Sequence, residues 1–147
     1  ARAFSALRRE LPRLAGVLSY SDPLPRHTDA GRVVTPGHVG QVYQALGAAY
    51  LGLGKSRKLH LDREGRTISE RALSKIRAMD KGWESAAARL VEAGADPRRI
   101  GEEPGEWLDR VLPTFRTVKH PGNHVYVWRW TGQKPDSLPY PKRNQGR

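Results

Sequence analysis

The feature that most restricts the fold of this sequence is a strand that ends in an acid and is followed by a loop and a short apolar helix. The stretch Gly16–Ser21 is apolar and small, and Asp22-Pro23 ends it, because proline has no amide hydrogen to donate to a strand ladder. Residues 23–37 are rich in proline and glycine and predict a loop. From His38 to Ala49 the apolar spacing predicts a helix that carries Tyr43. An acid at a strand end, facing a phenol on a helix, predicts a site at the edge of a sheet in an α/β domain.

Short helices and strands are predicted along the rest of the chain. Apolar residues recur at helical spacing from Phe4 to Leu14, and Thr67 and Glu70 have the spacing of a capping box that starts a helix. Two further helices are expected from Trp83 to Gly94 and from Pro104 to residue 112, with proline in a first turn and glycine at an end. Apolar and alternating runs predict strands at 16–21, 50–51, 57–62, 115–118 and 124–130. In the last of these, Tyr126, Trp128 and Trp130 share an aromatic face.

Positive charge is in excess and unevenly placed. Lys and Arg number 26 against 15 Asp and Glu, which gives a net charge of +11. Such a balance predicts a polyanionic partner, DNA or RNA first, and the alternative is a soluble arginine-rich protein. The helix after Thr67, with Arg71 and Lys75 on its exposed face, is the strongest candidate for contact with nucleic acid, a solvated face being the alternative.

Composition also excludes several classes. The chain has no cysteine, so it has no disulfide framework, thiolate metal site or cysteine nucleophile. No apolar run approaches the roughly 20 residues of a membrane span, and no signal-like segment opens the chain, so we expect a cytosolic protein that does not enter the membrane. A length of 147 residues is consistent with one domain. Because the first residue is Ala1 and the sole methionine is Met79, we expect either a trimmed initiator or a piece of a longer protein.

Several short motifs resemble known proteins. The segment Gly40–Gly47, GQVYQALG, followed by Tyr50, resembles the last helix of the GNAT superfamily of N-acetyltransferases, in which the tyrosine protonates the departing thiolate of coenzyme A. A narrower resemblance is to the Mom family, bacteriophage-type DNA modification proteins with a divergent GNAT fold that alter the exocyclic amine of adenine. It is carried by SYSDP at 19–23, GHVG at 37–40, HPGNHVYVW at 120–128 and LPYPK at 138–142.

The resemblance implies an α/β fold, the C-terminal part of a GNAT-like mixed sheet flanked by helices, with a helical insertion. Residues 1–66 would then form a strand-helix-strand core, 67–112 the insertion, 113–132 the closing strands, and 133–147 a basic, proline-containing tail. The phosphate-binding loop of that fold, Gln/Arg-x-x-Gly-x-Gly/Ala, has no counterpart in the sequence. We therefore expect either the C-terminal portion of such an enzyme or a relative without the cofactor half.

Transfer of an acyl group to an amine requires an acceptor for the amine proton, a donor for the leaving group and polar contacts for the oxyanion. The resemblance implies that Asp22 orients or deprotonates the adenine amine, that Tyr43 is the acid toward a thiolate, and that His38 relays protons or caps the helix. A turn-forming role for Asp22 and a core role for Tyr43 are the alternatives. The acyl donor is unassigned, an acetyl-CoA-like thioester being one candidate, and no residue is assigned to bind it.

The residues predicted to bind substrate offer a ring, a hydroxyl or a positive charge to a base or phosphate: Tyr20, Ser21, Tyr50, Arg71 and Lys75. Tyr20 and Tyr50 would stack on an extruded base, because a base inside the duplex cannot be reached, and a core position is the alternative for Tyr50. We expect no metal. His120 and His124 are four residues apart, but Pro121 and Gly122 prevent the helix that would align them. Convergence of one of these histidines with His38 and Asp22 on Fe or Zn is the open alternative.

Three functional hypotheses follow. The first is a Mom-like enzyme that modifies adenine in DNA, working in the cytoplasm of the host cell if it is encoded by a phage. The second is a basic nucleic-acid-binding or virion-associated module that keeps the scaffold without the chemistry. The third is an ordinary acetyltransferase for small molecules or proteins. The sequence makes no prediction of the oligomeric state.

Overall fold

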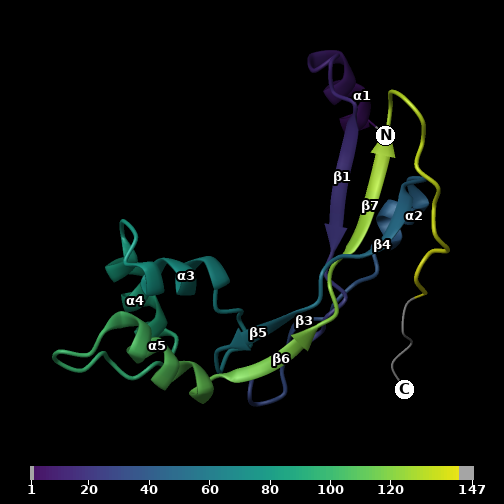
Figure 1. Cartoon of the computed structure of the whole chain (residues 1–147). Coiled ribbons are helices and arrows are strands. Elements are labelled where there is room, and N and C mark those ends of the chain that lie inside the picture. The colour runs from purple at the N-terminus through teal and green to yellow at the C-terminus, as the bar shows by residue number, and fades with distance from the viewer. Residues whose placement is uncertain (1, 143–147) are drawn as a thin grey trace. The chain divides into compact units, whose positions relative to one another are not determined.

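The structure, a computed structural model, describes residues 2–142 and is mixed α/β (Figure 1). Its Cα positions cluster into two compact units, although the length of the chain predicts one domain. Unit 1 comprises Ala1–Leu24, Gly37–Ser56 and Pro121–Arg147, and unit 2 comprises Pro25–Pro36 and Arg57–His120. The unit boundaries do not coincide with those expected at residues 66 and 112, because the strands on either side of the helical segment group with the helices. Within residues 2–142, no helix is long and apolar enough to cross a membrane.

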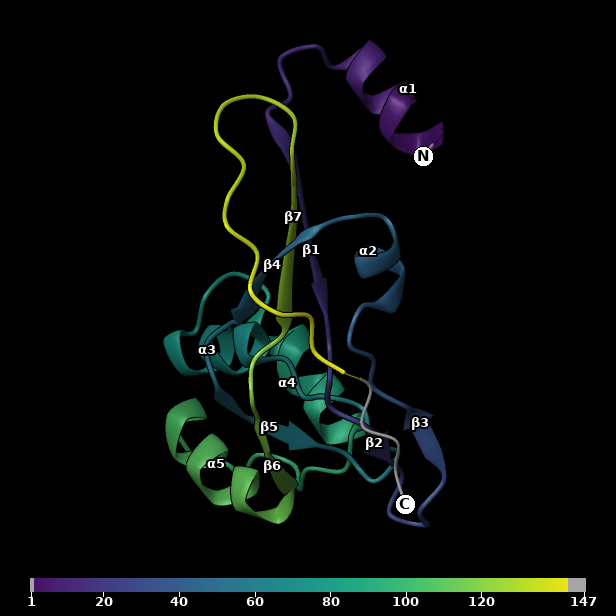
Figure 2. The same ribbon diagram turned by 90° about the vertical axis from the view of Figure 1, so that its right-hand side faces the viewer.

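Unit 1 is built on a three-stranded antiparallel sheet with the order β1-β7-β4 (Figures 1 and 2). Its elements are α1 (Arg2–Glu10), β1 (Gly16–Ser21), α2 (Gln41–Ala45), β4 (Ala49–Leu53) and β7 (His124–Arg129). The central strand, β7, pairs Ser21 with His124 on one side and Tyr50 with Tyr126 on the other. We refer to the side of the sheet that carries Ser21, His124 and Tyr126 as the inner face. β1 and β7 thus occupy the ranges that the sequence predicts.

Aromatic side chains fill the core of unit 1. Tyr126 is fully buried, and Tyr50 and Trp128 are less than a tenth exposed. Phe4 of α1 packs edge-on against Trp128, with ring centroids 4.9 Å apart. This inner face is the aromatic face predicted from alternation in the last strand, since side chains of a strand point alternately to its two faces.

Unit 2 combines two small two-stranded sheets with a helical cluster (Figures 1 and 2). The two sheets are β2 (Arg26–His27) with β3 (Val33–Thr35), and β5 (Arg57–Leu61) with β6 (Arg116–His120). The helices are α3 (Glu70–Ala78), α4 (Trp83–Glu92) and α5 (Pro104–Val111), followed by the 3₁₀ turn η1 (Leu112–Thr114). Their apolar sides meet around Ile76, Leu90, Trp107 and Leu108. The three helices lie where the sequence predicts them, and Trp107 is buried in the core between them.

Several predicted details are wrong for local reasons. The residues expected to be a plain loop, 23–37, contain β2 and β3, which pair across the short turn at Gly31. Ser69, not Thr67, caps α3 by accepting a hydrogen bond from the amide of Ala72 at 3.3 Å. Thr67 instead accepts a hydrogen bond from the guanidinium of Arg26 at 2.8 Å. All strand pairs in the described part of the chain are antiparallel, whereas a mixed sheet was expected.

The helix predicted from His38 to Ala49 is shorter than expected. α2 spans one and a half turns and stops before Gly47, whose φ of +69° is left-handed and breaks the helical path. Apolar spacing from His38 to Ala49 would place Val42 and Leu46 on one side of a helix, but in the structure they are 69% and 45% exposed. The tail follows an extended path as far as residue 142, and the amide of Leu138 donates to the carbonyl of Tyr50 at 2.9 Å.

Candidate functional site

The carboxylate of Asp22 forms the turn after β1. Its Oδ1 accepts a hydrogen bond from the amide of Leu24 at 2.9 Å, which is the geometry of an Asx turn. The backbone carbonyl of Asp22 accepts a hydrogen bond from the amide of His38 at 2.8 Å. The turn-forming alternative for Asp22 is therefore present in the structure. The same residue also fixes the place where the chain returns toward α2.

His38 lies between the other two residues predicted to be catalytic. It is exposed, and its ring contacts the ring of Tyr43, with centroids 6.5 Å apart and planes at 61°. Its backbone is bonded to Asp22, as described above. The structure thus links His38 to Asp22 through a backbone hydrogen bond and to Tyr43 through a ring contact.

Tyr43 is held by packing of its ring. It lies edge-on to Trp128, with centroids 5.7 Å apart and planes at 88°, and 5.4 Å from the ring of Tyr126. The side chain is half-buried, and its hydroxyl has no hydrogen-bond partner within residues 2–142. The core alternative therefore describes the ring of Tyr43, while the hydroxyl takes no part in that packing.

Gly40 lets the chain approach the inner face closely. Its φ is +72°, in the left-handed region that favours glycine, and it directly precedes α2. A Cβ at this position would lie 2.6 Å from Cε2 of Tyr126, 2.9 Å from Cδ2 of Tyr43 and 3.0 Å from Oγ of Ser21. A side chain here would push the segment that carries His38 and Tyr43 away from the sheet.

Ser21 has a buried hydroxyl without a partner. The residue is 1% exposed, and its Oγ makes no hydrogen bond to the described part of the chain. A buried polar atom in this state loses its hydration without compensation, which costs about 1–3 kcal/mol. Such unpaired atoms in a native structure are rare and point to a ligand, a water or stored strain.

A buried pair that the sequence did not predict lies next to Ser21. The hydroxyl of Tyr50 and Nδ1 of His124 are 2.8 Å apart, and both residues are less than a tenth exposed. Burial lowers the pKa of His124, and the nearby His38 lowers it further. Burial likewise raises the pKa of Tyr50, so the pair is neutral near pH 7. The inward register of His124 in its strand was the signal in the sequence for this position.

Tyr126 connects the sheet to the segment that carries the site. Its hydroxyl donates a hydrogen bond to the carbonyl of Val39 and accepts one from Nε2 of Gln44 at 3.0 Å. The same amide nitrogen lies 3.3 Å from the carbonyl oxygen of Pro141 in the tail. Alternation predicts that Tyr126 points inward, but no pattern in the sequence identifies the partners of its hydroxyl.

The residues predicted to bind substrate divide into separate groups. Ser21 and Tyr50 lie on the inner face with Tyr43, and the core alternative for Tyr50 is the correct one. Tyr20 is 53% exposed and points to the opposite face, because side chains of adjacent strand residues alternate. Tyr20 and Tyr50 therefore cannot stack together on one base. Arg71 and Lys75 lie on α3 in unit 2 and form no ion pair with any described residue.

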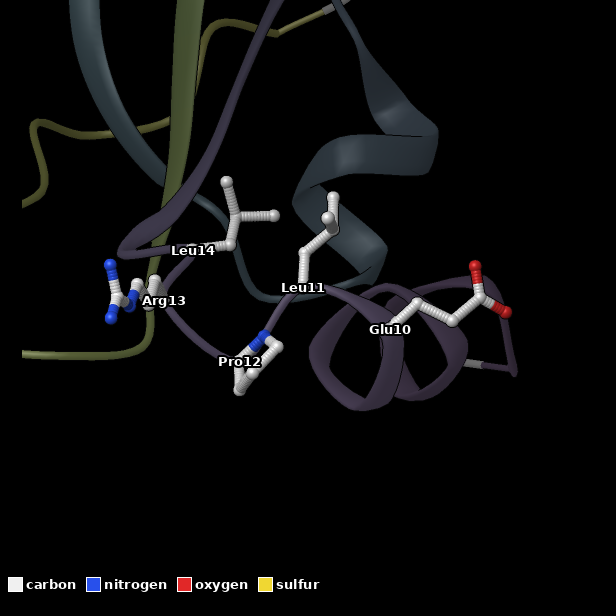
Figure 3. A pocket seen from close by; sticks show the side chains of 5 residues that line it. All are labelled: Glu10, Leu11, Pro12, Arg13 and Leu14. Atoms are coloured by element: carbon white, nitrogen blue, oxygen red, sulfur yellow. The ribbon is translucent and has the colours of Figure 1, made fainter.

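Within the part of the chain that the structure describes, no group of three histidine, aspartate or glutamate side chains could hold a metal ion. A hollow between α1 and β1 is lined by Glu10, Leu11, Pro12, Arg13 and Leu14 (Figure 3). None of the residues predicted to act in catalysis lines this hollow. The candidate site is accordingly the cluster of Asp22, His38 and Tyr43 with the buried Ser21 beside it.

We predict that Gly40→Ala destabilises unit 1 more than Gly47→Ala does. Both substitutions place a Cβ on a left-handed residue, but nothing lies within 4 Å of a Cβ at Gly47, whereas the ring of Tyr126 obstructs one at Gly40. Overpacking of this kind costs about 1–3 kcal/mol beyond the backbone strain. Urea unfolding followed by tryptophan fluorescence measures the difference, and equal midpoints for the two variants would contradict the close approach at Gly40.

We also predict that His124 contributes a loss of stability at mildly acidic pH. Its pKa is lowered in the folded state, so the unfolded chain binds the proton at a higher pH than the folded chain does. Its contribution is complete above the ordinary histidine pKa of about 6.5 and is lost as the pH falls below that value. Urea midpoints at pH 7.5 and 5.5 should therefore differ less in His124→Asn than in the parent. The same pH dependence in both proteins would show that His124 is not responsible.

Comparison with known proteins identifies no relative: no protein-family model, curated protein or solved structure matches this chain.

Proposed function

We propose that this chain belongs to a Mom-like enzyme that transfers an acyl-type group to the exocyclic amine of adenine in DNA, on a GNAT-like scaffold. The observation that carries the proposal is the position of His38. Its amide donates a hydrogen bond to the backbone carbonyl of Asp22 and its ring contacts that of Tyr43, so His38 links two residues that are distant in the sequence. The net charge of +11 supports a DNA substrate.

In this proposal Asp22 and His38 handle the proton of the amine. As the adenine nitrogen forms its new bond to the acyl carbon, it releases one proton, which the carboxylate of Asp22 accepts directly or through the exposed imidazole of His38. General bases positioned in this way contribute about 10²–10⁴-fold to a rate.

Tyr43 supplies a proton to the leaving group. Its ring is fixed by Tyr126 and Trp128, and its hydroxyl is unpaired within the described residues. An acyl thioester, when bound, supplies the electrophilic carbonyl carbon and a thiolate that departs as the carbon–sulfur bond breaks. Tyr43 would protonate this sulfur. One proton is thus donated to the leaving group for each proton that Asp22 accepts from the amine.

Ser21 is the residue of the inner face best suited to the acyl oxygen. Its Oγ is desolvated and has no hydrogen-bond partner among residues 2–142. Ser21 also directly precedes Asp22 in the sequence. A preorganised donor at a developing negative charge is commonly the largest single contribution to acyl transfer. An oxygen bound there would also supply the hydrogen bond that Ser21 lacks.

A second candidate function is a basic nucleic-acid-binding module without catalysis. The packing of Tyr43 in the aromatic core favours it, because a structural role already explains the ring of Tyr43. The positive charge supports this function as well as it supports the enzyme. Modification of DNA, and not binding of DNA, therefore separates the two.

We predict that Asp22→Asn and Tyr43→Phe each reduce DNA modification by about 10²-fold or more while DNA binding stays the same. Asparagine retains an oxygen that can accept from Leu24, and phenylalanine retains the ring that packs on Trp128, so both variants should fold. Nucleosides from plasmid DNA, isolated from cells that express the full-length protein, are analysed by mass spectrometry for a modified deoxyadenosine. Tyr20→Phe, on the opposite face of the sheet, is the matched control and should remain active. A parent that binds DNA but yields no modified nucleoside would favour the module.

Ser21→Ala separates a structural from a catalytic role for the hydroxyl. Removal of an unpaired buried hydroxyl should leave the urea midpoint unchanged or raise it, because the desolvation cost disappears. If Ser21 donates to the acyl oxygen, modification should fall by about 10²-fold. A variant with both stability and modification intact would exclude Ser21 from the reaction.

A further inference from the structure

One face of the two-stranded β5–β6 sheet of unit 2 is polar and basic. The register places Lys58 directly opposite Lys119, and His60 directly opposite Thr117. Directly paired residues of an antiparallel ladder point to the same face, so these four side chains form one surface, which we call the lysine face. The residues between them, Leu59 and Leu61, point to the other face and are 5% and 2% exposed.

The two lysines form a like-charge pair at close range. Side chains directly opposite in an antiparallel pair have Cβ atoms about 4.5–5.5 Å apart, and like charges in this position destabilise the strand pair. Both lysines are exposed, and neither forms an ion pair within residues 2–142. The β5–β6 sheet therefore carries an unfavourable pair of like charges that no described residue neutralises.

Four arginines of unit 2, in contrast, lie against carboxylates. Arg66, Arg77 and Arg110 each bind a carboxylate at 2.7 Å, those of Asp62, Asp109 and Glu102 respectively. Arg116, also on β6, lies 3.8 Å from Asp29 and donates to the carbonyl of His27. Carboxylates neutralise these guanidinium groups, whereas the ammonium groups of the lysine face are left for an anion from outside.

The dimensions and chemistry of the lysine face fit the duplex. Five paired residues at about 3.4 Å each make a ribbon about 17 Å long, the length of about five base pairs. The major groove of B-DNA is wide enough for a two-stranded ribbon. His60 and Thr117, whose Nδ1 and Oγ1 are 3.3 Å apart, add polar groups beside the two ammonium groups.

We propose that the lysine face binds the phosphate backbone of duplex DNA, with the β5–β6 ribbon lying along the major groove. The proposal rests on the DNA substrate of the proposed function and names the surface that holds it. This surface is different from the Arg71 and Lys75 face of α3 predicted from the sequence. The phosphates would neutralise the two ammonium groups, so binding would relieve the repulsion between Lys58 and Lys119 in the free protein.

The first test removes the two charges. Lys58→Gln/Lys119→Gln in the full-length protein should weaken binding to a fluorescent 20-base-pair duplex, measured by anisotropy between 50 and 300 mM KCl. The slope of log K against log salt should become shallower by about 1.8, since each lost phosphate contact removes about 0.9. The matched control, Lys81→Gln/Lys134→Gln, removes two other exposed lysines and should leave this slope close to that of the parent. Equal slopes for the two double variants would overturn the proposal.

The second test uses a substitution that should raise the stability of the protein and weaken its binding to DNA. Lys119→Glu places an acid directly opposite Lys58, so the melting temperature should rise, because an opposite-charge pair replaces a like-charge pair. DNA binding should fall, because the carboxylate repels phosphate. A misfolded variant would instead melt at a lower temperature. Unchanged DNA binding in a variant of raised stability would sink the proposal.

Two further comparisons identify the ligand and keep this proposal distinct from the enzymatic one. A duplex RNA of the same sequence should show little dependence on Lys58 and Lys119, because its A-form major groove is too narrow for a ribbon. An equal loss on DNA and RNA would overturn the assignment to duplex DNA. Binding is measured without modification: failure of the enzymatic proposal would leave the salt slopes of the lysine variants as predicted. Failure of the lysine face would leave the effects of Asp22→Asn and Tyr43→Phe on modification intact.

Discussion

The arrangement of unit 1 depends on the hydroxyl of Tyr126. This hydroxyl belongs to the central strand, is fully buried and holds the site-bearing segment to the sheet through Val39 and Gln44. The absence of a side chain at Gly40 permits the approach, and Gln44 extends the network to the tail at Pro141. A buried hydroxyl must be bonded to avoid its desolvation cost, so this network fixes α2 in one place on the sheet. His38 can link Asp22 to Tyr43 because both ends of the intervening segment join strands of the same sheet.

Hydrophobic spacing was sufficient to predict the elements that pack by side chains. β1, β7, α4 and α5 have regular apolar faces, and their ranges agree with the sequence to within a few residues. The predictions are wrong where the local structure depends on backbone geometry or on a partner that is distant in the sequence. Gly47 ends α2 with a left-handed φ, and β2 and β3 form in a stretch whose prolines and glycines predict a loop. Thr67 matches a capping box, but Arg26, 41 residues away, takes its hydroxyl.

The candidate site was predictable to the same extent. Motif and spacing selected Asp22, His38, Tyr43 and Ser21, which the structure places around one end of β1. Pairing across strands, which a single sequence does not reveal, decided the rest. Tyr50 became a core residue because its strand lies beside β7, and its hydroxyl meets His124. Tyr20 was assigned to the same site as Tyr50, but the strand alternation that buries Ser21 turns Tyr20 to the opposite face.

Two local departures from good packing lie at places proposed to act. Other polar groups are paired: Glu102, for instance, is hydrogen-bonded to Arg110 and to the amide of Arg99, which together hold its pKa at about 2. The unpaired hydroxyl of Ser21 and the opposed ammonium groups of Lys58 and Lys119 are exceptions to this order. Folding alone explains neither feature. Ser21→Ala would remove an unpaired buried hydroxyl, and an acid in place of Lys119 would pair with Lys58, so both changes would stabilise the fold. Natural proteins tend to keep such exceptions where a ligand completes them. An acyl oxygen and a phosphate are the partners that we propose for these two places.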